Sequence, residues 1–238
     1  MTSTDVISVI SKENPAIDSF SFHEFQQQRL IQDCIGFCGE KEQRMFDYAL
    51  QKKKEGIPFW DGIMLSVIGK DDYSEEIFRL ALRHNKHPFL TYVKRDDLMP
   101  WIYAPNRSID RVAFCSKVIM ANDHKEELHL PLIDFHIPVS DTNVRLVESV
   151  CKILEIGDGW LLNSGESYHF IGSRPIKYED LMVLLYKALM FTPIIDKAWI
   201  SHQLREGSCS LRIGKKRGME PQVVKCLSKI NKTKQTNI

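Results

Sequence analysis

The sequence contains few cysteines, and their spacing predicts neither disulfide bonds nor a zinc site. Six cysteines are scattered over 238 residues, and the closest pair, Cys34 and Cys38, has helical spacing. No apolar run reaches the roughly 18 residues that a membrane helix needs. The N-terminus also lacks the basic and apolar regions of a signal peptide. These absences predict reduced thiols, no membrane partner and a cytoplasmic location.

A strong charge of one sign is missing as well. Lysine and arginine number 32 against 31 acidic residues, so the net charge of +1 neither favours nor excludes a polyanionic partner. The distribution is uneven only near the C-terminus, where Glu220 is the single acidic residue between Leu211 and Ile238. That end of the chain is therefore locally cationic.

Apolar residues are plentiful, and a hydrophobic content of 43% is enough to fill a core. Their spacing distinguishes helices from strands along most of the chain. In chain order it predicts two helices between residues 22 and 54, a strand at 62–69, a helix from Ser74, a strand near 88–94, strands within 107–123 and 128–140, a helix from 141, a hairpin over 160–172 and an apolar helix at 177–191.

These elements predict an α+β or α/β fold in which a mixed sheet is flanked by helices. We expect three parts: a helical N-terminal region at residues 1–56, an α/β domain at 57–228 and a basic flexible tail at 229–238. The tail is expected to fray because it is polar and lies at a chain end.

Two polar residues interrupt the apolar strand in the segment LIDFH. Asp134 and His136 are two residues apart, so their side chains project from one face of the strand. A carboxylate and an imidazole placed in this way can bind a divalent metal if another carboxylate joins them. Pro131 and Pro138 bracket the pair, so an edge strand whose polar face meets water is the alternative.

A second pair, Ser167 and His169, repeats this spacing after a glycine turn in GESYHFIG. A serine near a histidine also occurs in hydrolases, but a nucleophilic serine sits on a sharp turn between a strand and a helix, which is missing here. A histidine on a strand can instead donate to a phosphate or a sugar. A half-buried histidine bonded to backbone remains the purely structural alternative.

The third group begins at Asp196, which follows the apolar triplet that ends a predicted strand. Arginine forms paired hydrogen bonds to phosphate oxygens, and a carboxylate beside basic residues suits a nucleotide with a bound metal. Basic residues follow within about twenty positions, namely His202, Arg205, Arg212, Lys215 and Lys216.

The order of these motifs, from about Leu128 to Val224, resembles the archaeo-eukaryotic primase superfamily. The resemblance implies a primase-like, RRM-like sheet with Mg²⁺ or Mn²⁺ as cofactor. It also implies roles for individual residues: metal binding and catalysis for Asp134, His136 and Asp196, and nucleotide binding for Ser167, His169, Arg205, Arg212 and Lys215.

The function that the resemblance implies is synthesis of short primers from nucleoside triphosphates on a single-stranded template. One departure matters, because the first motif of the family ends in Asp or Glu and here it ends in His136. A neutral imidazole adds no negative charge, so the site could prefer manganese, use one ion or have lost polymerisation.

The alternative is therefore a catalytically degenerate module that binds nucleic acid or a nucleotide in a replication, mobile-element or defence assembly. Whether the protein is an enzyme stays open at this point. The sequence has no P-loop or helicase segment, so we expect a protein partner such as a helicase or another assembly subunit.

Overall fold

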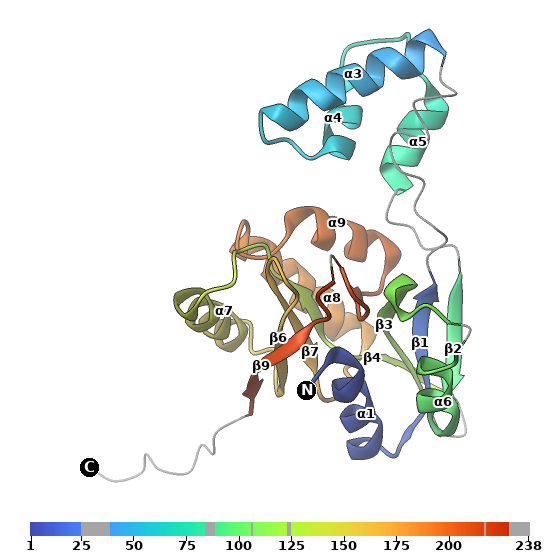
Figure 1. Ribbon diagram of the computed structural model, residues 1–238, viewed down its shortest axis with the longest axis vertical. Coiled ribbons are helices and arrows are strands. Elements are labelled where there is room, and N and C mark those ends of the chain that lie inside the picture. Colours follow the sequence, from blue (N-terminus) through green and yellow to red (C-terminus); the bar gives the residue numbers. More distant parts are fainter. Residues whose placement is uncertain (25–38, 84–88, 106, 123–124, 217, 229–238) are drawn as a thin grey trace. The chain divides into compact units, whose positions relative to one another are not determined.

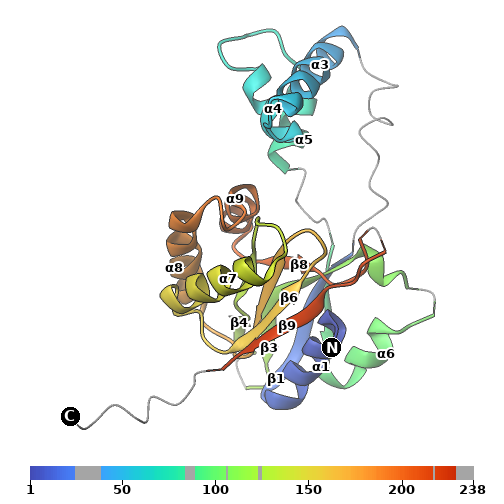
Figure 2. The same cartoon turned by 60° about the vertical axis from the view of Figure 1, so that its left-hand side comes forward.

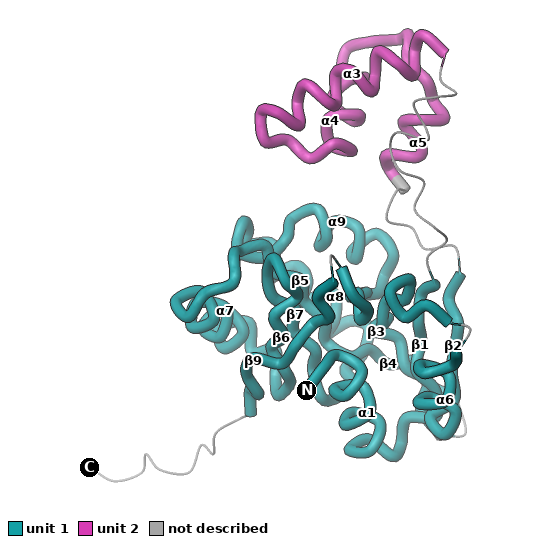
Figure 3. The backbone as a smooth tube through the Cα atoms, in the orientation of Figure 1, with its two compact units in different colours: residues 1–25, 87–238 teal, residues 26–86 magenta. Residues whose placement is uncertain are grey.

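The computed structural model describes residues 1–24, 39–83, 89–105, 107–122, 125–216 and 218–228 (Figure 1). The chain forms two compact units, one made of residues 1–25 and 87–238 and the other of residues 26–86 (Figure 3). We refer to them as unit 1 and unit 2. The predicted basic tail at 229–238 and most of the first helix expected after residue 22 lie outside the described residues.

Unit 1 contains two sheets whose described strand pairs are all antiparallel (Figure 2). The first sheet has the order β2-β1-β3-β4, with β8 also paired to β3, and the second has the order β5-β7-β6-β9. The strands are β1 (Ile17–Glu24), β2 (Leu90–Lys94), β3 (Val112–Met120), β4 (Glu127–His129), β5 (Leu132–Asp134), β6 (Gly159–Asn163), β7 (Tyr168–Gly172), β8 (Ser210–Arg212) and β9 (Gln222–Leu227).

Helices flank these sheets and share one hydrophobic core with them. The α-helices of unit 1 are α1 (Ser3–Glu13), α6 (Leu98–Ile102), α7 (Asp141–Ile153), α8 (Tyr178–Ala188) and α9 (Lys197–Glu206), with short 3₁₀ turns at Arg95–Asp97, Ile109–Arg111 and Leu189–Phe191. The predicted α+β class is confirmed, as are the β6–β7 hairpin and the helices expected at 141 and 177–191. Ser140 begins α7, because its hydroxyl accepts the Asn143 amide at 3.1 Å.

Our sequence-based boundary at residue 56 falls inside unit 2. The N-terminal region is not wholly helical, since β1 pairs with β3 and thereby belongs to the first sheet. Unit 2 instead comprises the part of the chain that connects β1 to β2, and its described helices are α3 (Glu40–Lys54), α4 (Phe59–Ser66) and α5 (Glu75–Arg83).

The prediction of a strand at 62–69 is wrong, because helix α4 occupies most of these residues. Phe59 and Ile63 are four residues apart and both buried, so the apolar run has a helical face. The Phe59 ring stacks on Phe46 of α3 with centroids 5.8 Å apart. A short apolar run fits a strand and a buried helix equally well, and here packing against α3 selects the helix.

Candidate functional site

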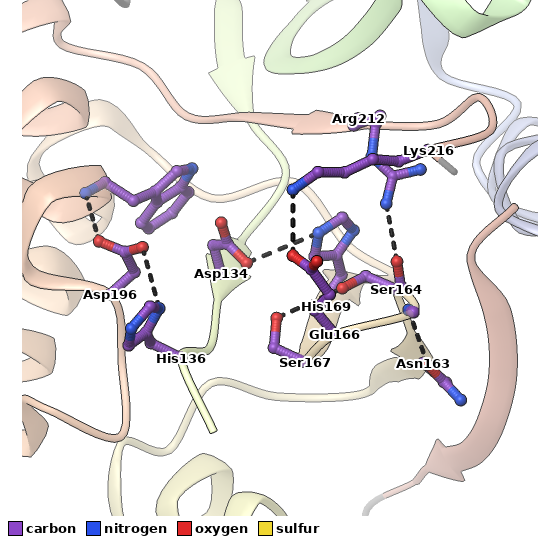
Figure 4. Close-up of polar contacts among 12 residues, drawn as sticks. Asp134, His136, Asn163, Ser164, Glu166, Ser167, His169, Asp196, Arg212 and Lys216 are labelled. Atoms are coloured by element: carbon purple, nitrogen blue, oxygen red, sulfur yellow. Dashed lines mark hydrogen bonds and ion pairs between the residues drawn. The ribbon is translucent and has the colours of Figure 1, made fainter. Parts of the chain in front are cut away.

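Asp134 ends β5 at the edge of the core. Leu132 and Ile133 before it and Phe135 after it are 0%, 0% and 1% exposed, so strand β5 is anchored by its apolar residues. Asp134 is paired in register with His169 on β7. Its Oδ1 atom lies 3.6 Å from His169 Nε2, and the two side chains are 26% and 8% exposed (Figure 4).

Burial shifts the protonation equilibria of both groups. It raises the pKa of Asp134 to about 8, and the nearby Asp196 charge adds to the effect. Burial, together with the charges of Arg212 and Lys216, lowers the pKa of His169 to about 3. The imidazole of His169 is therefore neutral at pH 7, with one ring nitrogen as a donor and the other as an acceptor.

Backbone hydrogen bonds hold the segment that contains Asp196 beside the segment that contains Asp134. The Asp196 amide donates to the Asp134 carbonyl at 3.1 Å, and the His136 amide donates to the Ile194 carbonyl at 2.7 Å. The strand predicted to end just before Asp196 is reduced to an isolated bridge between Ile195 and Phe135. Asp196 is the N-cap of α9, and its Oδ1 accepts the Trp199 amide at 2.9 Å, which is the role that aspartate favours at a helix start.

His136 extends from the same segment toward the solvent. Its Nδ1 lies 3.5 Å from Asp196 Oδ2, and its side chain is 72% exposed. Asp134 and His136 were predicted on one strand, but β5 ends at Asp134, so His136 lies beyond the strand, after the buried Phe135. The two residues also contact different partners, Asp134 with His169 and His136 with Asp196.

Two cations complete the surroundings of Asp134 (Figure 4). Arg212 on β8 donates through Nη2 to the Ser164 carbonyl at 2.8 Å and through Nη1 to the Gly214 carbonyl. The Lys216 ammonium lies 3.3 Å from Glu166 Oε2. Both cations are close enough to counteract part of the rise in the pKa of Asp134.

The other predicted nucleotide-binding residues lie at the margin or outside this cluster. Ser167 is in the β6–β7 turn, where its hydroxyl lies 3.3 Å from that of Ser164. Arg205 lies in the last turn of α9, with Nε 4.0 Å from Glu206 Oε1. Lys215 is exposed, and its amide donates to Asp110 at 2.5 Å. Its neighbour Lys216 is the lysine that approaches Asp134.

Period-two alternation could have identified the correct lysine. Residues 212, 214 and 216 follow one another on one side of an extended chain, so Lys216 rather than Lys215 shares the side of Arg212. Gly214 permits the close backbone path between them, because a Cβ there would lie 2.3 Å from the Ile109 carbonyl oxygen. The roles of Ser164 and Glu166 had no comparable signal, since both lie in a turn.

The three predicted metal ligands do not form a ready-made cage. In the described ranges, no three His, Cys, Asp or Glu side chains are grouped so that they could hold a metal ion. However, Mg²⁺ is commonly bound through one or two carboxylates together with waters and substrate phosphates. The adjacent Asp134 and Asp196 carboxylates fit a cation of this kind, because the Asp196 charge raises the pKa of Asp134 and a positive charge between the two would offset that effect.

Comparison with known proteins identifies the family of the chain. Residues 98–225 match the family described as archaeo-eukaryotic primase 1D-like, and the matched region includes both carboxylates, His169 and Arg212. No curated protein and no solved structure is significantly similar to the chain. Among the described helices, none is long and apolar enough to cross a membrane. Because the match covers more than half of the 238 residues, the chain belongs to the archaeo-eukaryotic primase 1D-like family.

Proposed function

We propose that this chain is a primase-type nucleotidyltransferase that adds nucleotides to a growing primer on a single-stranded template. The observation that carries the proposal is the approach of Asp134 and Asp196, from different elements, beside a neutral histidine and two cations. The two carboxylates would bind one Mg²⁺ or Mn²⁺ that arrives with a nucleoside triphosphate. Membership of the primase family supports the same substrate class.

The bound cation would supply positive charge at the triphosphate and at the attacking hydroxyl. His169 would donate a hydrogen bond from its neutral ring to a phosphate or sugar oxygen. Arg212 uses two of its N–H groups on the Ser164 and Gly214 carbonyls, which orients the guanidinium so that its remaining donors can contact phosphate. Lys216 would exchange Glu166 for a phosphate oxygen.

His136 favours a second candidate function. In the related primases an acid stands at this position, whereas the imidazole here contacts Asp196 and adds no negative charge at neutral pH. If this substitution weakens cation binding too far, the protein would bind nucleotide or nucleic acid without catalysis. A replication, mobile-element or defence assembly would then use it as a binding module, and another subunit would supply the catalytic activity.

The test is incorporation of labelled nucleotides on single-stranded DNA, with Mg²⁺ and Mn²⁺ in parallel. Asp134→Asn and Asp196→Asn each remove one negative charge with little change of shape. Both variants should lower incorporation at least about a hundredfold, because each carboxylate is needed to hold the cation. Asp180→Asn is the matched control, since Asp180 is an exposed aspartate in the first turn of α8.

The results distinguish the two functions. Normal product from Asp134→Asn would contradict the proposed site. Nucleotide binding by the wild-type protein without product, under conditions in which a known primase is active, would identify the binding module instead. The control should retain the activity of the wild type in either metal.

A further inference from the structure

The first sheet presents a polar face on the side opposite its core. Phe20 and Phe22 of β1 are both 0% exposed and form part of the core. Alternation along the strands directs Ser21, His23 and Tyr92 to the other face, where Tyr92 is 42% exposed. We call this the polar face, and it consists of His23, Tyr92, Lys94, Lys117, Glu127 and Arg212.

Tyr92 is held in one position on the polar face. Its hydroxyl donates to Glu127 Oε2 at 2.8 Å, and the Lys117 ammonium lies 2.8 Å from Glu127 Oε1. Because these contacts already fix the partly exposed Tyr92 ring, stacking of a flat ligand on it costs little side-chain entropy.

The polar face continues into the candidate site. His23 on β1, Ala113 on β3 and Arg212 on β8 are aligned in register across the sheet. Arg212 in turn donates to Ser164 in the site at 2.8 Å. Three strand spacings separate β2 from β8, which is roughly 15 Å. The row ends at Leu90 on β2, which pairs with His23, and Tyr92 lies two residues farther along that strand, so a ligand that extends from the site along this row would pass close to Tyr92.

We propose that the polar face binds the single-stranded template, with one base stacked on Tyr92 and with Lys94 and Lys117 near its phosphates. The proposal rests on the proposed function, since it places the template of that reaction. Stacking platforms flanked by cations are the general means of binding single strands. Of the polar face, His23, Tyr92 and Lys94 lie outside the matched residues 98–225, whereas Lys117, Glu127 and Arg212 lie within them.

Charge favours a polyanion over a protein of mixed charge. The face has three cations against Glu127 and Glu206, the latter close enough to His23 to influence its ionisation. Glu127 accepts from Tyr92 and forms an ion pair with Lys117, so the charges of Glu127 and Lys117 offset each other. Lys94 and Arg212 then stand against Glu206. The single strand is therefore the occupant that the face fits, and both DNA and RNA offer the required bases and phosphates.

The test measures fluorescence anisotropy of the full chain with labelled oligothymidylate and, in a second arm, oligouridylate. Tyr92→Ala should weaken binding about tenfold, the loss expected when one stacked base is no longer supported. Tyr92→Phe retains the ring and should stay within about twofold of the wild type. Lys117→Gln should weaken binding and lower the slope of log affinity against log salt by about 0.7.

Tyr186→Ala is the matched control, because Tyr186 is a 61% exposed tyrosine on α8 and is not one of the residues of the polar face. It should bind both oligonucleotides like the wild type, and Tyr92→Ala should bind a nucleoside triphosphate normally. Equal affinities of Tyr92→Ala and the wild type would overturn the proposal, as would equal losses in Tyr92→Ala and Tyr186→Ala. A wild-type protein that binds triphosphate but no single strand would also overturn it and leave the nucleotide site standing. Single-strand binding that depends on Tyr92, without nucleotide incorporation, would instead refute the proposed activity.

Discussion

The candidate site has two halves that use the same pair of residue types in opposite settings. In the buried half, His169 is 8% exposed and faces Asp134 between two paired strands. In the exposed half, His136 is 72% exposed and faces Asp196 at the start of a helix. Two backbone hydrogen bonds join the segments of the two halves, from the Asp196 amide to the Asp134 carbonyl at 3.1 Å and from the His136 amide to the Ile194 carbonyl at 2.7 Å.

This comparison separates the effect of residue type from that of environment. Both halves consist of a carboxylate and an imidazole, but burial shifts the pKa values of Asp134 and His169 strongly. Asp196 instead has one oxygen engaged by the Trp199 amide. The buried half should therefore respond strongly to changes of charge, whereas the exposed half should respond chiefly through its helix cap and through the cation.

The largest expected effect is on the stability of the protein, and it comes from Asp134 in the buried half. The pKa of Asp134 is raised to about 8, so the folded protein holds a proton that the unfolded chain releases above about pH 4. The free energy of unfolding should fall as the pH rises through this window. Asp134→Asn has no charge to desolvate and should be more stable than the wild type at about pH 8.5, on the order of 3 kcal/mol or roughly 6–12 °C in melting temperature.

Thermal unfolding of both proteins at about pH 5 and pH 8.5, without divalent cations, measures this difference. Adding Mn²⁺ at the higher pH should raise the melting temperature of the wild type more than that of Asp134→Asn. Equal melting temperatures at both pH values would show that Asp134 ionises without cost in the folded protein.

The next effect contrasts the two histidines. His169→Ala removes a neutral donor from the buried half and should weaken triphosphate binding about 10- to 100-fold, the loss expected for a hydrogen bond to a charged group. His136→Ala removes a solvent-exposed ring and should cost about twofold or less. Titration of each variant with a triphosphate and Mn²⁺ measures both. Equal losses would mean that burial does not distinguish the two halves.

A smaller effect should follow when the acid usual in primases is restored. His136→Asp adds a negative charge beside Asp196, which should help an oxygen-preferring ion to bind. The Mg²⁺ concentration for half-maximal incorporation should fall about fivefold. His136→Asn provides the neutral control of similar size, and an unchanged Mg²⁺ requirement in His136→Asp would show that this position does not influence the cation.

The smallest effect concerns the helix cap of the exposed half. Asp196→Ala removes the acceptor of the Trp199 amide and should destabilise the protein by about 1 kcal/mol, or roughly 2–4 °C. Asp196→Asn retains an acceptor and should melt within about a degree of the wild type. Both variants lose the charge, so incorporation should fall equally in both. If Asp196→Ala and Asp196→Asn differed in nucleotide incorporation, the hydrogen bond that caps α9 would also help to position the site.

The sequence was sufficient where local pattern and tertiary packing agree. The β6–β7 hairpin has apolar strands on both sides of a glycine turn, and α7 has a serine cap before an amphipathic run, so both could be predicted. The apolar run at 62–69 was ambiguous, because its partner α3 decides between helix and strand. The β1 strand lay in a polar N-terminal region and forms through pairing with strands distant in the chain.

The candidate site was predicted in part for the same reason. Asp134, Asp196, His169 and Arg212 meet as the motif order implied. The partners within the site could not be predicted, because spacing along one strand does not say which residue stands opposite. Register pairs Asp134 with His169, and the helix cap orients Asp196. Lys216 could have been preferred to Lys215, because period-two alternation places it on the side of Arg212.

Unit 2 is inserted between two neighbouring strands, β1 and β2, so it could be removed or exchanged without interrupting either sheet. Its ends emerge from β1 and β2, and His23 and Leu90 near those ends are directly paired. In topological terms, the whole of residues 26–86 is an enlarged hairpin loop. Loop closure costs only about 0.6 kcal/mol more for each doubling of loop length, so long insertions at such a point are cheap. Replacing unit 2 by a short turn should therefore leave the first sheet able to form, and the same opening could accept a different module.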